Sequence, residues 1–254
     1  PATGIGNYSF DDFDSAMRFG VTKDGHRMYP AMPYPSYAKM SEQDMRALYD
    51  FFMNEVEPVN LANQASDIPG WKDNARLVMG IWNFLNMDSD PFEADPNQND
   101  DWNRGAYLTQ GPGHCGACHT PRGLMMQEKG LDEGDSSFLA GAPLDHWNAS
   151  SLNGDINSGL GRWSEDDLAE FLGTGHNRFG TAFGTMVEVV NNSTQYMNET
   201  DLNAMAVYLK SLPPVAEVNA SAWGYDNTET EALLGLNFSE AGSQDYYEYC
   251  SNCH

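Results

Sequence analysis

Apolar side chains recur at helical spacing in three separate stretches of the chain. These are residues 45–52, 75–87 and 202–209, where large apolar residues return every three or four positions and so line one face of a helix. No stretch alternates apolar and polar residues over the length of a strand. The pattern therefore predicts a mainly α fold.

Short polar residues mark where several of the predicted helices begin. Each stands three positions before an acidic residue, an arrangement in which the two side chains cap the first helical turn. The pairs are Ser9 with Asp12, Ser41 with Asp44, Ser164 with Asp167, and Asn198 with Asp201. We also expect single helices over 75–87 and 102–108, the second of which crosses the last helix of its unit.

The four cysteines of the chain fall into two copies of one motif, C-x-x-C-H. The copies are Cys115, Cys118 and His119, and Cys250, Cys253 and His254. This is the attachment motif of a c-type haem. Two thiols three positions apart lie on one side of a helical turn and can reach the two haem vinyl groups. The histidine that follows then projects its imidazole toward the iron.

Three other sites use the same cysteine spacing. Two C-x-x-C pairs can hold one zinc ion in a site of four thiolates. A single pair can be a redox dithiol, which is typical of a βαβ context that this sequence lacks, and four cysteines can form two disulfides. A histidine directly after both pairs is required by haem and by none of these alternatives, so we favour haem, with zinc next.

An internal repeat extends beyond the cysteine motifs. Residues 3–13 read T-G-I-G-N-Y-S-F-D-D-F, and residues 158–168 read S-G-L-G-R-W-S-E-D-D-L. A turn-rich loop, a methionine and a capped helix follow each copy, in the same order. Tyr8 and Trp163 hold matching positions, where we expect core side chains. Because the second copy follows its haem motif, the first is interpreted as the later part of a haem unit.

The repeat divides the chain into four segments. Residues 1–60 form the C-terminal part of a first haem unit, and residues 61–98 form a connecting helix and an acidic linker. Residues 99–216 form a complete second unit, and residues 217–254 form a linker and the start of a third. Since the chain opens without a methionine and stops at a haem motif, we expect an internal piece of a longer exported protein, with its leader and anchor elsewhere.

Charge narrows the choice of partners. The 254 residues include 13 Lys and Arg against 37 Asp and Glu, a formal net charge of −24. This argues against nucleic acid and against electrostatic docking on anionic lipid. We interpret the acidity mainly as a means of solubility. The second interpretation is an acidic face that attracts a basic redox partner. No apolar run approaches the ~20 residues that span a bilayer.

The sixth iron ligand is predicted from the repeat. Coordination by histidine and methionine is the choice of electron-transfer haems. Met186 precedes the last helix of the second unit, in a loop where such a ligand is expected, and Met32 holds the matching place in the first repeat. Most of the 13 methionines are expected to fill the core. The alternatives near the second haem are Met125, Met126 and Met197, or His146 and His176 in a haem with two histidine ligands.

Two arginines are candidates for contacts with the haem propionates. Arg122 follows the first motif, and Arg178 lies in the loop before Met186. Guanidinium groups form strong charge-assisted hydrogen bonds with carboxylates, although an ordinary surface position is an equal alternative for each.

Four stretches resemble one known family. They are Y-P-A-M-P-Y-P-S-Y-A-K-M at 29–40, W-N-R-G-A-Y-L at 102–108, G-H-C-G-A-C-H-T-P-R at 113–122, and A-V-Y-L-K-S-L-P-P at 206–214. The family is the triheme cytochrome c subunit of bacterial membrane-bound dehydrogenases that act on alcohol, gluconate, sorbitol or fructose. The resemblance covers nearly the whole chain and implies tandem class-I-like cytochrome c domains, one complete and two partial.

The resemblance also implies residue roles and partners. Met32 matches the distal ligand of a first haem c, Cys115, Cys118, His119 and Met186 the ligands of a second, and Cys250, Cys253 and His254 those of a third. A subunit carrying flavin, PQQ or, in some aldehyde-oxidising versions, molybdopterin would oxidise the substrate. Electrons would then pass through the haems to ubiquinone or a terminal oxidase, on the periplasmic side of the inner membrane. The alternative is a free-standing multihaem enzyme with an open iron site.

Overall fold

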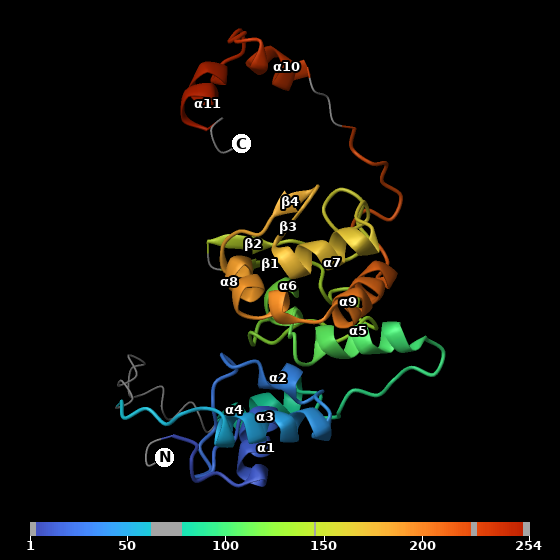
Figure 1. The fold of residues 1–254 in the computed structure, drawn as a ribbon. Coiled ribbons are helices and arrows are strands. Elements are labelled where there is room, and N and C mark those ends of the chain that lie inside the picture. The colour runs from blue at the N-terminus through green and yellow to red at the C-terminus, as the bar shows by residue number, and fades with distance from the viewer. Residues whose placement is uncertain (1–3, 62–77, 145, 225–227, 251–254) are drawn as a thin grey trace. The chain divides into compact units, whose positions relative to one another are not determined.

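The computed structural model describes residues 4–61, 78–144, 146–224 and 228–250, and these residues are mainly helical, as predicted. They belong to two compact units, Pro1–Asn219 and Ala220–His254. The helices are α1 (Phe10–Phe19), α2 (Tyr34–Tyr37), α3 (Glu42–Asn54), α4 (Met79–Asn86), α5 (Asp100–Gln110), α6 (Gly116–His119), α7 (Glu165–Thr174), α8 (Thr185–Asn192), α9 (Glu199–Ser211), α10 (Thr228–Leu234) and α11 (Ser243–Tyr249) (Figure 1). A 3-10 turn, η2 (Thr194–Tyr196), precedes α9.

Four short strands form two antiparallel hairpins. They are β1 (Ala142–Leu144) with β2 (Trp147–Ala149), and β3 (His176–Asn177) with β4 (Gly180–Thr181). In the first hairpin Ala142 pairs with Ala149, and in the second His176 pairs with Thr181. Both are too short to produce an alternating pattern in the sequence. None of the helices in the described part of the chain is long and apolar enough to cross a membrane.

The predicted caps begin the helices that they were expected to begin. Ser9 Oγ accepts a hydrogen bond from the Asp12 amide, and the Asp12 carboxylate accepts one from the Ser9 amide. Ser164 and Asp167 form the same reciprocal pair at the start of α7. The side chains of Ser41 and Asn198 cap α3 and α9. These contacts satisfy amide groups that have no partner inside the helix.

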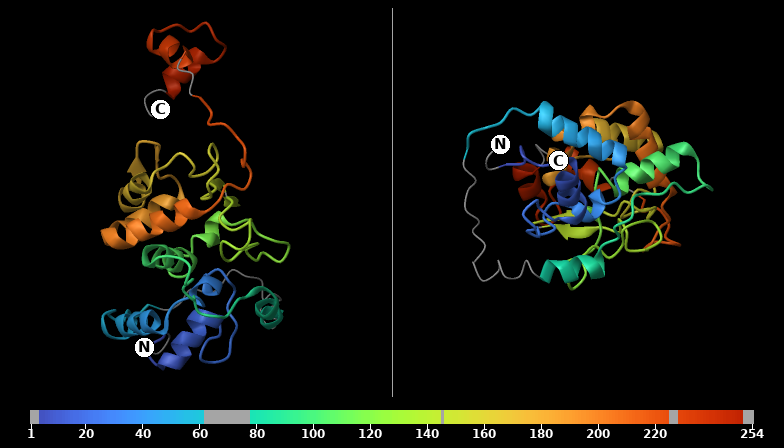
Figure 2. Two further views of the ribbon diagram at one scale, coloured as in Figure 1. Left: turned by 90° about the vertical axis from the view of Figure 1, so that its right-hand side faces the viewer. Right: turned by 90° about the horizontal axis from the view of Figure 1, so that it is seen from below.

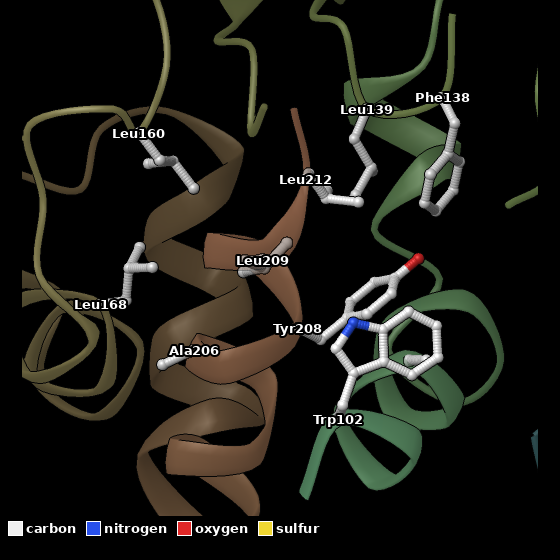
Figure 3. Packing of buried hydrophobic residues seen from close by; sticks show 10 residues of the cluster. Trp102, Phe138, Leu139, Leu160, Leu168, Ala206, Tyr208, Leu209 and Leu212 are labelled. Carbon is white, nitrogen blue, oxygen red and sulfur yellow. The ribbon is translucent and has the colours of Figure 1, made fainter. Parts of the chain in front are cut away.

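The core of the first unit forms where α5 crosses α9, and α7 packs on the other side of α9 (Figure 1). The ring of Trp102 meets that of Tyr208 edge-on, with centroids 5.1 Å apart, and its indole N–H donates to Ser211 Oγ at 2.7 Å (Figure 3). Leu139, Leu160, Leu168, Leu209 and Leu212 pack around this pair. The prediction that helix 102–108 crosses the last helix of its unit is therefore confirmed.

The two repeated stretches share local structure beyond their caps. Both helices end at a glycine in the left-handed conformation, and a short antiparallel pairing follows each. At the same distance along the chain from each capping aspartate, a cation pairs with that aspartate. In the first repeat these features are Gly20, the bridge Val21–Arg27 and the ion pair Lys23–Asp12 (3.1 Å). In the second repeat they are Gly175, the hairpin β3–β4 and the ion pair Arg178–Asp167 (2.8 Å).

Three predicted segments differ from the structure. The helix expected over 75–87 is α4 and begins at Met79, residues 75–77 lying outside the described part. The loop expected before the last helix contains α8, so the prediction of a loop at Met186 is wrong. The linker-like stretch after Pro214 contains α10. The start of α8 has no side-chain cap of the kind that marked the other helices.

Within the first repeat, α1 packs against α2 and contacts α3 (Figure 2). Hydrogen bonds join this repeat to α5. The Tyr107 hydroxyl accepts from the Ser41 amide at 3.1 Å and donates to the Asp44 carboxylate. Lys39 is buried, and its ammonium group donates to Gln110 Oε1 at 3.2 Å. These contacts hold the capped start of α3 against the helix that leads to Cys115.

Candidate functional site: the C-x-x-C-H turn

The first motif lies on a single helical turn directly after α5. The amide of Cys115 donates to the carbonyl of Thr109, and the amide of His119 donates to the carbonyl of Cys115. The turn α6 therefore folds back against the end of α5. Cys115 packs against the two apolar clusters of the core, and burial raises the pKa of its thiol to about 12.

The imidazole of His119 is oriented by a backbone carbonyl. Its Nδ1 lies 2.8 Å from the oxygen of Ser150, which can only accept, so Nδ1 carries the proton. The lone pair of the neutral ring is then on Nε2, where an iron can bind it. Burial also lowers the pKa of His119 and keeps the ring neutral. A histidine that ligates a metal generally has this second contact, which fixes its tautomer and orientation.

Met186 and Cys115 border the same apolar cluster. The cluster consists of Tyr107, Leu108, Leu172, Leu202 and Met205. Met186 lies in the first turn of α8 and is partly buried. Cys115, the predicted attachment point, and Met186, the predicted distal ligand, thus pack against one apolar cluster. This is the arrangement expected of residues on the two sides of a haem pocket.

A contact between the two hairpin regions places the first turn of α8. Gly184 precedes α8 with a φ of 55°, and a Cβ at this position would lie 2.7 Å from the ring of Trp147. Trp147 begins β2, which leads to Ser150. The strand that orients His119 and the turn that carries Met186 therefore touch. No side chain in the sequence signals either contact, because Gly184 has none and Ser150 contributes its backbone carbonyl.

The alternative ligands are placed differently from Met186. Met125 and Met126 are exposed, at 45% and 68%. His146 and His176 are exposed as well. Met197 is partly buried and borders the same cluster as Met186. Met197 is therefore the main alternative to Met186 as the distal ligand.

The two candidate arginines contact protein groups. Arg178 makes a bidentate contact with Asp167, at 2.8 and 2.9 Å, and its guanidinium lies over the ring of Phe179. Arg122 donates to the carbonyls of Ala117 and Met126 and lies 3.6 Å from the carboxylate of Glu128. Arg122 is thus beside the attachment turn, while Arg178 supports the cap of α7.

The remaining predicted haem ligands come from the first repeat and from the C-terminal segment. Met32 packs against the buried cluster of Tyr34, Met79 and Trp82. Cys250 follows the last turn of α11 and is exposed. Cys253 and His254 lie outside the described residues.

The residues around the first motif fit a c-type haem. They offer two thiols for attachment, one imidazole nitrogen with a free lone pair, and a thioether sulfur beside an apolar surface, the donor set of a haem with histidine and methionine ligands. Within the described residues, no group of three or more His, Cys, Asp and Glu side chains gathers as a metal site. A mainly helical chain with this site has the features of a c-type cytochrome.

Known proteins resemble the chain over most or all of its length, although no family model matches it. The gluconate 2-dehydrogenase cytochrome c subunit of Pantoea cypripedii is 46% identical over 99% of this chain and 58% of that protein. The alcohol dehydrogenase (quinone), cytochrome c subunit, of Gluconobacter oxydans is 45% identical over 100% of this chain and 53% of that protein. The diheme cytochrome c-type of Cereibacter sphaeroides is 35% identical over 85% of this chain and 69% of that protein.

The chain belongs to the family of c-type cytochromes that contains these proteins. The resemblance to cytochrome c subunits of dehydrogenases is thereby confirmed, and haem c is the cofactor that the family implies. The chain spans a little over half the length of the two dehydrogenase subunits.

Proposed function

We propose that this chain transfers electrons as part of the cytochrome c subunit of a dehydrogenase complex. The names of its relatives support this assignment, since they are the cytochrome subunits of a gluconate and an alcohol dehydrogenase. The observation that carries it is the orientation of His119. Because the Ser150 carbonyl holds Nδ1, the lone pair of Nε2 is free to bind iron. The ring belongs to the same motif as two thiols, and Cys115 and Met186 border one apolar cluster.

Each residue of the site has a defined task in this proposal. Cys115 and Cys118 would form the thioether bonds that fix a haem to the turn α6. His119 Nε2 and the Met186 sulfur would hold its iron. When bound, haem supplies a one-electron couple between ferric and ferrous iron. The apolar cluster would keep water from the iron, and a thioether ligand would raise the potential relative to a second histidine.

The same proposal covers the other predicted ligands. The chain contains tandem class-I-like cytochrome c domains, over the segments 1–60, 99–216 and 217–254. Met32 is the distal ligand of a first haem, and Cys250, Cys253 and His254 attach and ligate a third. The similar local structure of the two repeated stretches supports a shared architecture.

The partners in this proposal are those that the resemblance implies. A catalytic subunit with flavin or PQQ, or molybdopterin in some versions, supplies electrons, and ubiquinone or a terminal oxidase accepts them. The protein acts on the periplasmic side of the bacterial inner membrane, because covalent haem attachment takes place in exported proteins. Its acidic surface, with a net charge of −24, favours a basic electron partner.

The distal ligand decides between electron transfer and an open catalytic site. We would compare Met186→Leu with the matched variant Met197→Leu, in the haem-loaded protein. The measurements are the methionine-to-iron charge-transfer band of the oxidised protein and carbon monoxide binding by the reduced protein. Met186→Leu is expected to lose one equivalent of the band and to bind one equivalent of carbon monoxide. Met197→Leu is expected to behave like the wild type.

The opposite pattern would contradict the assignment. If Met197→Leu loses the band and Met186→Leu keeps it, the distal ligand is Met197. If the wild-type protein already binds carbon monoxide at this haem, the iron site is open, and the alternative of a free-standing multihaem enzyme is supported.

A further inference from the structure

A buried carboxylate lies against the attachment turn. The side chain of Glu128 is 7% exposed, and its Oε2 occupies the space that a Cβ on Gly116, between the two cysteines of the motif, would fill. Its Oε1 lies 3.6 Å from the guanidinium of Arg122, an ion pair rather than a hydrogen bond. The backbones of Arg122 and Glu128 also pair as an antiparallel bridge, which fixes the carboxylate beside the turn.

Two opposing effects set the proton affinity of Glu128. Burial penalises the charged carboxylate and raises its pKa, while the positive charge of Arg122 lowers it, and burial prevails. The side chain of Arg122 is 35% exposed, so water screens part of its charge. A carboxyl group balanced in this way responds to any further change of charge nearby.

Glu128 lines a hollow of about 340 Å³ together with residues of the first repeat. The titratable and charged side chains that face it there are His114, Cys118 and Arg122. The negative charge of Glu128 also raises the pKa of the Cys115 thiol on the same turn. The lining contributed by residues 30–35 and by α4 carries no charge. Once the cysteines form thioethers they no longer titrate, so Glu128 and His114 are the groups of this hollow that can change charge.

We propose that Glu128 binds a proton when the haem attached at Cys115 and Cys118 is reduced. The inference rests on the proposed function. One electron from the dehydrogenase partner lowers the positive charge of the iron site by one. The Glu128 carboxylate then takes one proton from water in the hollow and forms an O–H bond. When the acceptor removes the electron, the carboxylic acid releases the proton to water, so charge and atoms balance over the cycle.

The sign of the pH dependence follows from this coupling. Oxidised iron disfavours a proton on Glu128, and reduced iron favours it, so the proton affinity is higher in the reduced state. The reduction potential of this haem therefore falls as pH rises between the two proton affinities. Outside that window Glu128 contributes no pH dependence, because its charge is then the same in both redox states.

Infrared difference spectra between the reduced and oxidised haem-loaded protein test the proposal directly. The C=O stretching band of a protonated carboxyl group is expected to appear on reduction. Carbon-13 labelled glutamate is expected to shift the band, which distinguishes it from an aspartate side chain. The band is expected to be lost in Glu128→Gln and kept in the control Glu170→Gln, which removes an exposed carboxylate on α7. A band of an imidazole in its place would assign the proton to His114 and contradict the proposal.

A second variant covers the case in which Glu128→Gln fails to hold haem. Arg122→Gln removes the opposing cation, so the pH-dependent window of the potential is expected to move to higher pH. A carboxyl band that persists in Glu128→Gln, the absence of any such band on reduction, or an unmoved window in Arg122→Gln would each overturn the role of Glu128. All three leave the proposed function intact if the haem is still reduced and reoxidised reversibly. A protein with no reversible haem couple at this motif contradicts the proposed function itself.

Discussion

Gly105 on α5 lies directly against the carbonyl oxygen of Ala204 on α9, where the two helices cross. A Cβ at this position would overlap that oxygen and crowd the Cβ of Tyr208, so the helices approach more closely than any other residue permits. Overpacking a core typically costs about 1–3 kcal/mol, and a backbone obstacle moves less easily than a side chain.

Gly105→Ala is therefore expected to lower the free energy of unfolding by at least that amount. Gly180→Ala is the matched control, because a Cβ there meets nothing within 4 Å. Chemical unfolding of the two variants measures the difference. Equal effects of both substitutions would show that the crossing adapts to a methyl group.

Tyr107 connects α5 to the start of α3 through two hydrogen bonds. Tyr107→Phe leaves the Ser41 amide and the Asp44 carboxylate without this partner. Removing one partner of a part-buried polar contact costs about 1–3 kcal/mol, and we expect a loss of this size in the free energy of unfolding. Tyr196→Phe, at a side chain 76% exposed, is the control. An unchanged stability in Tyr107→Phe would mean that water replaces the hydroxyl at no cost.

Asp167 makes the stability of the α7 cap depend on pH. Hydrogen bonds from Arg178 and Ser164 lower its pKa from 3.8 to about 2. A depressed pKa stabilises the fold above the unfolded value, and this contribution disappears as pH falls from 3.8 toward 2. The difference in melting temperature between wild type and Asp167→Asn is thus expected to be largest near neutral pH and to vanish in strong acid.

The corresponding variant in the first repeat provides a comparison. Asp12 has the same cap, but its cation is Lys23, which is 48% exposed and contacts it at one point. Asp12→Asn is expected to show a smaller pH-dependent effect, since a single exposed ion pair contributes little. A larger effect at Asp12 would contradict this ranking.

Gly184 determines where α8 begins and therefore where Met186 lies. Its φ of 55° and the ring of Trp147 leave no room for a side chain. A non-glycine residue in a disfavoured backbone region costs about 1–3 kcal/mol. Gly184→Ala is expected to lose that stability and also to weaken the methionine-to-iron band, because the first turn of α8 must shift. A destabilised variant with an unchanged band would separate the fold of this turn from iron ligation.

Sequence reasoning succeeded where the cause of a structure lies in neighbouring residues. Ser9, Ser41, Ser164 and Asn198 predicted helix starts because a cap is formed by residues three positions apart. It failed at α8, whose first residue is preceded by Gly184, which has no side chain to form a cap. The start of that helix depends on Trp147, distant in sequence, and no local pattern encodes the contact.

The candidate site divides in the same way. The motif indicated Cys115, Cys118 and His119 because the chemistry of attachment fixes their spacing. The carbonyl of Ser150, which orients His119, belongs to the backbone, and any residue could supply it. The sequence does not mark Glu128, because its carboxylate reaches the turn only through the folding of the chain between Arg122 and Glu128.

The burial of Cys115 has a consequence for the order of events as the protein matures. Thiolates are the reactive form of cysteine, and a thiol whose pKa is raised to about 12 is almost wholly protonated at neutral pH. Haem-free, folded protein is expected to resist alkylation at Cys115 and to react fully once unfolded, whereas rapid labelling of the folded form would contradict this. Haem attachment at Cys115 is therefore expected to be faster in the unfolded segment than in the folded one, where the raised pKa of the thiol slows its reaction.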